Sequence, residues 1–279
     1  MSTAAPPHVD DTVLRAAWLY YRENLTQDRI AKALGVSRAT VGRLLERARR
    51  EGIVRVEIDP DLLGAVGIAA ALSAKYERTE VLVVPSDGVE HDQAEINARL
   101  ARAAAQLLSR RLAPDDTLAI GWGDTVVKTV TQLPAGRQIV TLTGGVGSYP
   151  GALSARFGES LSMIPAPFLA STPERAETFA SEGSIEQIMT QAIAAEWKLV
   201  GVGGLNPEAS IVKFGYQTAD DLRDLEGSGS VGDILGLFYG IDGQIFDLDL
   251  HRRRIGVDLD DLANAPGTLI AAAGGTDKR

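Results

Sequence analysis

Apolar residues recur at helical spacing near the start of the chain and predict a group of short helices. The first helix begins after a cap at Asp10 or Asp11, and its apolar face carries Trp18 and Tyr21. Large aromatic side chains are highly buried on average, so we expect Trp18, Tyr20 and Tyr21 to pack in a core.

A second and a third helix are predicted to meet at a glycine. Thr26 caps the second helix, over residues 27–34, and Gly35 follows it, where a helix can end in a left-handed residue. Ser37 caps a third helix that runs to Arg50. A helix, a glycine-containing turn and a basic second helix form a helix-turn-helix; the alternative is an ordinary αα-hairpin with a solvated basic face.

We expect the third helix to enter the major groove of DNA. Residues near its start would contact bases or phosphates, and the arginines further along would bind the backbone. The predicted DNA-binding residues are Gln27, Ser37, Arg38, Ala39, Thr40, Arg43, Arg47 and Arg50.

Residues 53–58 alternate apolar and polar side chains, which predicts a strand and hence the short wing of a winged helix. The sequence therefore predicts a DNA-binding domain over residues 10–58. Residues 1–9, rich in Ala and Pro, are expected to form a disordered tail.

The rest of the chain alternates apolar strands with helices. The expected elements are helices over 62–76, 96–112, 124–133 and 184–197, and strands over 80–84, 117–120, 138–142, 198–202 and 269–273. Such alternation is typical of an α/β domain with a mostly parallel sheet, which we expect over residues 59–279. The predicted fold class is thus a two-domain α+β chain, a (winged) helix-turn-helix followed by an α/β domain.

Several predicted strands end in glycine, in the sequences GWGDT, TGGVG, GVGGL and AGGTDK. In an open α/β sheet this edge binds small ligands, because glycines let backbone N–H groups approach them. We therefore expect a pocket there, with Thr125 holding a phosphate or sugar hydroxyls and Lys278 acting as a phosphate-binding lysine. Asp233, which we expect before an apolar helix, would face a sugar hydroxyl.

The distribution of charge changes the picture of the whole chain. The net charge of −9 argues against nucleic acid, but residues 26–58 carry eight Lys or Arg against four Asp or Glu. The first 25 residues sum to −1, which leaves −12 on the remainder. Contact with a phosphate backbone is therefore expected at one end of the chain, while the acidic body repels DNA.

Candidate chemistry is sparse. The 279 residues include no cysteine, and the spacing of His8, His91 and His251 suits neither a metal site nor a catalytic triad. We expect no catalytic residues, metal or cofactor. The chain also shows no secretory signal and no apolar run of about 18–20 residues, so neither export nor a membrane span is expected.

The residues from about Leu14 onwards resemble the SorC/DeoR-type sugar-binding transcriptional regulators. The motifs that carry the resemblance are LTQDRIAKALGVSRATVGRLLERARREGIVRVEI, GWGDT, LTGGVG, IPAPFLASTPE, LVGVGGL, FGY, GSVGDILGLFYGIDG, RRIGVDLDDL and AAAGGTDK. The resemblance implies a cytoplasmic bacterial regulator whose effector domain is similar in fold to sugar-phosphate isomerases and deaminases. It also implies double-stranded operator DNA, a sugar, polyol or phosphosugar effector, and a dimer or tetramer.

By the same resemblance, the effector would lie at Gly123, Asp124, Thr125, Thr143, Gly144, Gly145, Asp233 and Lys278. Some relatives carry Lys or Arg where this chain has Thr143, and often a small hydroxyl residue or Arg where it has Asp124. These two departures favour a neutral or weakly charged sugar or polyol. The family usually continues beyond the AGG…K turn, so we expect a shortened domain or one completed by a neighbour.

Three functions fit these patterns to different degrees. The first is a transcriptional regulator controlled by a carbohydrate effector. The second is a sugar-phosphate isomerase or deaminase with a DNA-binding appendage, which the residues do not favour because no paired general acid and base is found. The third is a constitutive DNA-binding protein whose large domain only oligomerises.

Overall fold

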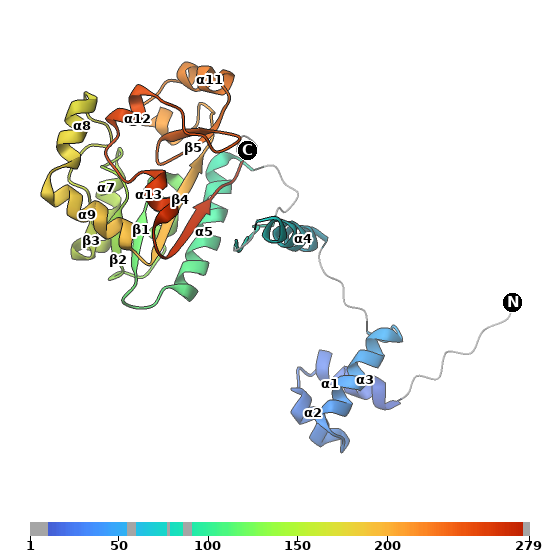
Figure 1. The fold of residues 1–279 in the computed structure, drawn as a ribbon. Helices are drawn as coiled ribbons and strands as arrows, with labels where there is room; N and C mark the ends of the chain where they lie inside the picture. The colour runs from blue at the N-terminus through green and yellow to red at the C-terminus, as the bar shows by residue number, and fades with distance from the viewer. Residues whose placement is uncertain (1–10, 55–59, 77–78, 86–90, 276–279) are drawn as a thin grey trace. The chain divides into compact units, whose positions relative to one another are not determined.

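A computed structural model describes residues 11–54, 60–76, 79–85 and 91–275. The chain divides into two compact units, Met1–Asp87 and Gly88–Arg279, coloured blue to blue-green and green to red in Figure 1. None of the described helices is long and apolar enough to cross a membrane.

The first unit begins with three helices that form the predicted helix-turn-helix. They are α1 (Asp11–Tyr21), α2 (Gln27–Leu34) and α3 (Arg38–Arg50). Thr26 caps α2 by accepting a hydrogen bond from the Arg29 N–H at 3.4 Å, and Ser37 caps α3 by accepting one from the Thr40 N–H at 3.1 Å. Gly35 lies between them with a φ of 67°, so both caps and the glycine turn are confirmed.

Small and aliphatic residues form the core of the three helices. Its two clusters are built around Ala16, Ile30, Ala31, Val41 and Leu45 and around Val13, Ala17 and Ala48. The prediction that aromatic residues pack in this core was wrong, because Trp18 is 54% exposed and Tyr20 and Tyr21 are exposed as well. Alanines occupy the inward face of α1, and the aromatic rings lie on its other sides.

Residues between the helix-turn-helix and the second unit fit the sequence predictions in part. The helix α4 (Pro60–Lys75) confirms the predicted apolar helix. Residues 80–84, predicted as a strand, have no regular secondary structure and belong to none of the described strand pairs. An apolar run becomes a strand only when a neighbour pairs with its backbone. Most of the predicted wing, residues 55–58, and the tail at 1–9 lie outside the described residues.

The second unit alternates helices and strands. Its helices are α5 (Gln93–Arg111), α6 (Asp124–Val130), α7 (Tyr149–Phe157), the 3₁₀ helix η1 (Gly158–Ser160), α8 (Pro173–Ala180), α9 (Gly183–Ala194), α10 (Ser210–Lys213), α11 (Ala219–Gly227), α12 (Asp249–Arg253) and α13 (Leu259–Asn264). Its strands are β1 (Thr117–Ile120), β2 (Gln138–Thr141), β3 (Leu161–Ser162), β4 (Trp197–Gly203), β5 (Ser230–Ile234), β6 (Leu237–Gly240) and β7 (Thr268–Ala272).

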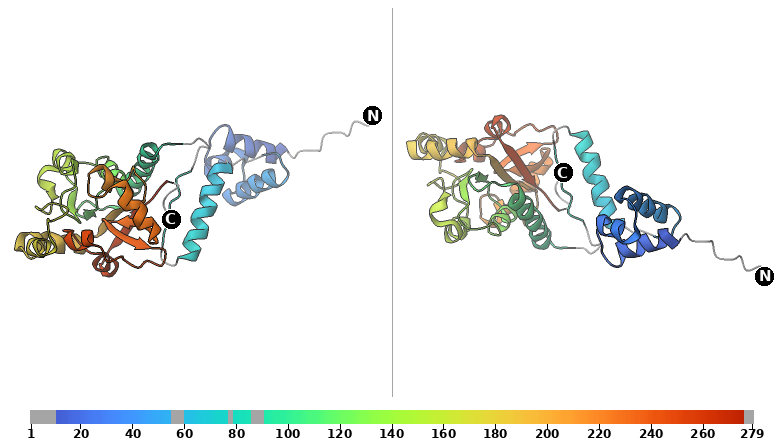
Figure 2. Two further views of the ribbon diagram at one scale, coloured as in Figure 1. Left: turned by 90° about the horizontal axis from the view of Figure 1, so that it is seen from above. Right: turned by 90° about the horizontal axis from the view of Figure 1, so that it is seen from below.

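Five strands form a parallel sheet in the order β3-β2-β1-β4-β7. The sheet is covered on both faces, as the views in Figures 1 and 2 show. On one face, α5, α6 and α7 pack Leu108, Val126 and Leu153 against the sheet. On the other face, α9 and α13 contribute Ala192 and Leu262. The predicted parallel α/β domain is confirmed.

An antiparallel hairpin extends the sheet. The strand β5 pairs with the last residues of β4 through Val202 and Gly203, and β6 pairs with β5. The sequence analysis expected an apolar helix after Asp233, which is wrong: Leu235 and Gly236, both with positive φ, turn the chain back as a strand. This hairpin places Asp233 beside the carboxyl end of β4.

Candidate functional site

The exposed face of α3 carries most of the predicted DNA-binding residues. Val41 and Leu45 point into the core, whereas Ser37, Arg38, Ala39, Arg43 and Arg50 are exposed and Gln27, Thr40 and Arg47 are half-buried. An amphipathic helix that buries one stripe must present the opposite stripe to solvent, so these basic side chains are available to a partner.

Hydrogen bonds organise the start of α3. The Ser37 and Thr40 hydroxyl oxygens are 2.9 Å apart, and Arg43 Nη2 donates to Thr40 Oγ1 at 3.4 Å. Arg38 lies 3.7 Å from Asp28, and both side chains are largely exposed. Arg47 Nε forms a closer ion pair with Glu51 at 2.6 Å, which a DNA phosphate would have to replace.

The glycine-rich ends of four strands lie at one edge of the parallel sheet. The strands β1, β2, β4 and β7 run in the same direction, so GWGDT, TGGVG, GVGGL and Gly274-Gly275 follow their carboxyl ends together. The predicted juxtaposition of these loops is confirmed. In open α/β sheets this edge is the usual position of a ligand.

A polar cleft of about 70 Å³ lies at this edge. It brings together four of the predicted effector residues: Gly123, Asp124, Thr125 and Asp233. Other polar lining residues, which the sequence analysis missed, are Gln93, Asn97, Asn206, Glu208 and Ser210. Among the described lining residues, none carries a positive charge.

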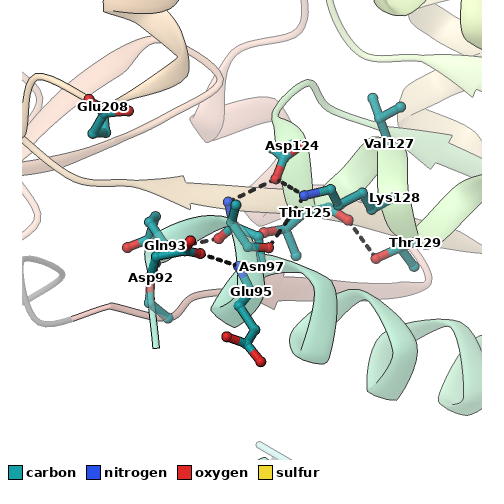
Figure 3. Close-up of polar contacts among 12 residues, drawn as sticks. Asp92, Gln93, Glu95, Asn97, Asp124, Thr125, Val127, Lys128, Thr129 and Glu208 are labelled. Atoms are coloured by element: carbon teal, nitrogen blue, oxygen red, sulfur yellow. Dashed lines mark hydrogen bonds and ion pairs between the residues drawn. The ribbon is translucent and has the colours of Figure 1, made fainter. Parts of the chain in front are cut away.

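A chain of polar contacts holds Asp124 in the wall of this polar cleft (Figure 3). Asp124 Oδ2 accepts from Lys128 Nζ at 2.6 Å and from Asn97 Nδ2 at 3.0 Å. Gln93 Nε2 donates to Asn97 Oδ1 at 2.8 Å and to the Gly274 carbonyl at 3.0 Å. The start of α5 is therefore tied both to α6 and to the glycine loop after β7.

Asp233, on β5, also lines the polar cleft and is 6% exposed. Its Oδ2 accepts from the Gly236 N–H at 3.0 Å, within the hairpin turn. Oδ1 lies only 1.7 Å from the position that a Cβ at Gly203 would occupy. The carboxylate can therefore take this position only because residue 203 is a glycine. A buried carboxylate of this kind can accept hydrogen bonds from ligand hydroxyls.

The other predicted effector residues do not join the polar cleft. Thr143, Gly144 and Gly145 line a second cavity, of about 340 Å³, at the carboxyl end of β2. Trp122 lines both cavities. Lys278 lies outside the described residues. Within the part of the chain that the structure describes, no group of three His, Asp or Glu side chains is placed to hold a metal ion.

Gln93 and Asn97 were missed for a physical reason. They lie four residues apart at the start of α5, on one face of the helix. The sequence analysis placed the start of this helix at Ile96, and amides near a helix end usually read as solvated or capping groups. Only the packing of α5 against α6 shows that they face a cleft.

Two family models match the chain. The model "Putative sugar-binding domain" matches residues 61–279, and the model "Homeodomain-like domain" matches residues 7–56. The first of these covers more than half of the chain.

Curated relatives match over nearly the whole chain. The transcriptional regulator LsrR of Enterobacter sp. (strain 638) is 36% identical over 280 residues, covering 96% of this chain and 84% of the relative. The LsrR of Escherichia coli (strain K12 / DH10B) is 34% identical, covering 96% and 86%.

Solved structures agree with the observed fold. The full-length sorbitol operon regulator SorC from Klebsiella pneumoniae has a TM-score of 0.65 and 26% identity, covering 97% of this chain and 91% of that chain. A DeoR family transcriptional regulator from Listeria monocytogenes has a TM-score of 0.65 and 26% identity, covering 77% and 88%.

Proposed function

Because the chain belongs to the family of SorC-type sugar-binding transcriptional regulators, we propose that a carbohydrate bound in its polar cleft controls the binding of α3 to operator DNA. The chain is a DNA-binding transcriptional regulator with a sugar-binding effector domain, and its named relatives are regulators rather than enzymes. The proposal adds the place and the residues through which control is exerted.

The single observation that supports the ligand site most strongly is the polar cleft at the carboxyl edge of the sheet. Its buried carboxylate at Asp233 and its amides at Gln93, Asn97 and Asn206 offer both acceptors and donors to hydroxyl groups. We propose that Gly123, Asp124, Thr125 and Asp233 bind the effector, with Lys278 in the same role.

Lys128 forms an ion pair with Asp124 at 2.6 Å, although the sequence predicted that this carboxylate would repel phosphate. This pairing balances the carboxylate, so we include phosphosugars with sugars and polyols as candidate effectors. Thr143, in the second cavity, supplies no charge to either class.

We further propose the assignment of domains and the setting of the protein. The DNA-binding domain would span residues 10–58 and the effector domain residues 59–279, which the two family matches support. The division into compact units instead groups α4 with the helix-turn-helix. A cytoplasmic location would give the protein access to the chromosome, and a dimer or tetramer would present two copies of α3 to two half-sites.

A ligand screen tests the control by carbohydrates. Binding raises the apparent thermal stability by mass action, so sugars, polyols and phosphosugars are screened for a rise in Tm of the full chain. We expect Asp233→Asn to abolish the rise for the ligand found, and Asp247→Asn, at an exposed carboxylate, to keep it. If no compound of these classes stabilises the wild-type chain, the proposed control is overturned.

A further inference from the structure

The second cavity differs in character from the polar cleft. Its lining is mainly apolar, with Val127, Val146, Pro150, Leu153, Met163, Ile164, Pro165 and Ala166 among its residues. Two of its hydroxyls are engaged within the protein: Thr141 Oγ1 accepts from the Ile164 N–H at 3.0 Å, and Thr143 Oγ1 donates to the Gly144 carbonyl at 3.1 Å. Among the described residues, no charged side chain lines it.

The cavity has a volume of about 340 Å³ and a mainly apolar lining. The volume falls within the range of small-molecule sites, which run from about 300 to 1,000 Å³. An apolar ligand group in this cavity would make dispersion contacts with its lining.

The cavity and the polar cleft adjoin each other at Trp122. Trp122 lines both, and its indole Nε1 is buried without a hydrogen-bond partner among the described residues. Tyr149 lines the cavity, and its hydroxyl forms a hydrogen bond with Ser210, which lines the cleft. The two spaces are therefore neighbours, close enough for two parts of one ligand.

We propose that this second cavity binds an apolar substituent, such as an aromatic ring, carried by the same carbohydrate whose hydroxyls occupy the polar cleft. The inference rests on the proposed function for the polar part of the ligand. It assigns the effector to a class of amphiphilic carbohydrates, such as aryl or alkyl glycosides. Trp122 would contact the ligand at the junction between the two parts.

A first experiment tests the cavity without any sugar. The chain has three methionines, of which Met163 lines the cavity, whereas Met189 does not line it and packs in two core clusters, one of them shared with Ile164 and Ala166. In the full chain labelled with ¹³C-methyl methionine, we expect a titration with toluene to shift the Met163 signal more than the Met189 signal. Ala166→Leu, which fills the cavity, should abolish the shift. A Met163 signal that does not respond to saturating toluene overturns the proposal.

A second experiment tests the link to the carbohydrate. For each sugar that stabilises the chain, the affinities of its methyl and phenyl glycosides are compared by calorimetry. We expect the phenyl form to bind at least about tenfold more tightly, and Ala166→Leu to remove this difference, whereas Ala209→Leu in the polar cleft should weaken both forms. Equal affinities of the two glycosides in the wild-type chain overturn the proposal.

The two experiments separate the inference from the proposed function. If no sugar binds in any form, the control by carbohydrates fails, and the toluene titration still decides whether the cavity binds apolar groups. A cooperative thermal unfolding transition shows that Ala166→Leu is folded. If this variant does not fold, it is replaced by Ala166→Val, for which a smaller toluene shift than in the wild-type chain is expected.

Discussion

Two glycines without a Cβ allow close contacts in and beside the proposed effector site. At Gly203 a Cβ would lie 1.7 Å from Asp233 Oδ1, and at Gly144 a Cβ would lie 2.2 Å from the Pro167 carbonyl oxygen. Neither distance is compatible with an unchanged structure, so these glycines are required by the close approach of neighbouring groups. The glycine-ended strands of the sequence thus have a local steric cause.

Substitution of Gly203 tests this requirement. We expect Gly203→Ala to displace the Asp233 carboxylate and to reduce ligand affinity by at least about tenfold, because a misplaced acceptor loses its hydrogen bonds to the ligand. Affinity is measured by calorimetry with the ligand found in the screen. The matched control is Gly227→Ala, at the end of α11, whose Cβ would meet nothing within 4 Å and which should bind normally. Equal affinities in the two variants would contradict the steric argument.

His251 couples stability to pH. Burial lowers the pKa of its imidazole below the ordinary value of 6.5. The ring accepts at Nε2 from the Phe238 N–H at 3.0 Å, while Nδ1 lies 2.7 Å from the Phe246 carbonyl oxygen, which it reaches as a donor. Protonation of Nε2 removes the first of these bonds, so the folded state favours the neutral ring.

The sign of this pH effect follows from linkage. Between the lowered pKa and 6.5 the unfolded chain binds more protons, so the free energy of unfolding rises with pH in this window. We therefore expect stability to fall as the pH decreases through about 6.5, and His251→Gln to weaken this dependence. Denaturant unfolding at several pH values measures it, with His91→Gln as the second histidine for comparison. A wild-type pH profile retained in His251→Gln would exclude His251 as its source.

Elements with their own capping signals were predictable from the sequence, and elements that depend on distant partners were not. The ends of α2 and α3 could be predicted from Thr26, Gly35 and Ser37, because capping is a local interaction. The β5–β6 hairpin was mistaken for a helix, since its apolar residues fit either period over so short a run. The apolar run at 80–84 read as a strand although no described strand pairs with it.

The candidate site divides along the same line. The glycine loops could be found from the sequence, since parallel strands bring their carboxyl ends to one edge. Asp233 was expected at the site but before a helix, whereas it reaches the polar cleft on the antiparallel strand β5. Gln93 and Asn97 could not, because they enter the polar cleft only through the packing of α5 on α6. Nor could the sequence show that Thr143 lies in a cavity separate from Asp124.

At the scale of one helix, α3 is expected to carry the affinity for DNA. Arg43 is exposed, near the start of the helix, and its guanidinium is held by Thr40. We expect Arg43→Ala to weaken binding to a selected operator by about 1–3 kcal/mol and to leave ligand affinity unchanged. Fluorescence anisotropy measures the DNA affinity, and Arg223→Ala, at an exposed arginine of α11, is the matched control. An unchanged operator affinity would remove Arg43 from the DNA-binding residues.

Over the whole molecule, a basic helix-turn-helix is joined to an effector domain that carries the excess of acidic charge. The polar cleft and α3 belong to different compact units, so control of one by the other is an exchange of free energy between two sites. The first helix of the second unit, α5, carries Gln93 and Asn97 of the cleft directly after the connecting residues. A ligand that contacts these amides acts where the chain enters the second compact unit.

Such coupling must be reciprocal. If the ligand changes the Kd for operator DNA by a factor, DNA must change the Kd for the ligand by the same factor, typically about 5- to 150-fold. We expect both factors to agree when operator affinity is measured with and without saturating ligand, and ligand affinity with and without saturating operator. Asn97→Ala, which breaks the contacts of the α5 amides with Asp124, should reduce both factors together. If a ligand binds the cleft but leaves operator affinity unchanged, the protein is a constitutive DNA binder. A ligand that binds the DNA-bound and the free protein equally well does not shift the equilibrium between them.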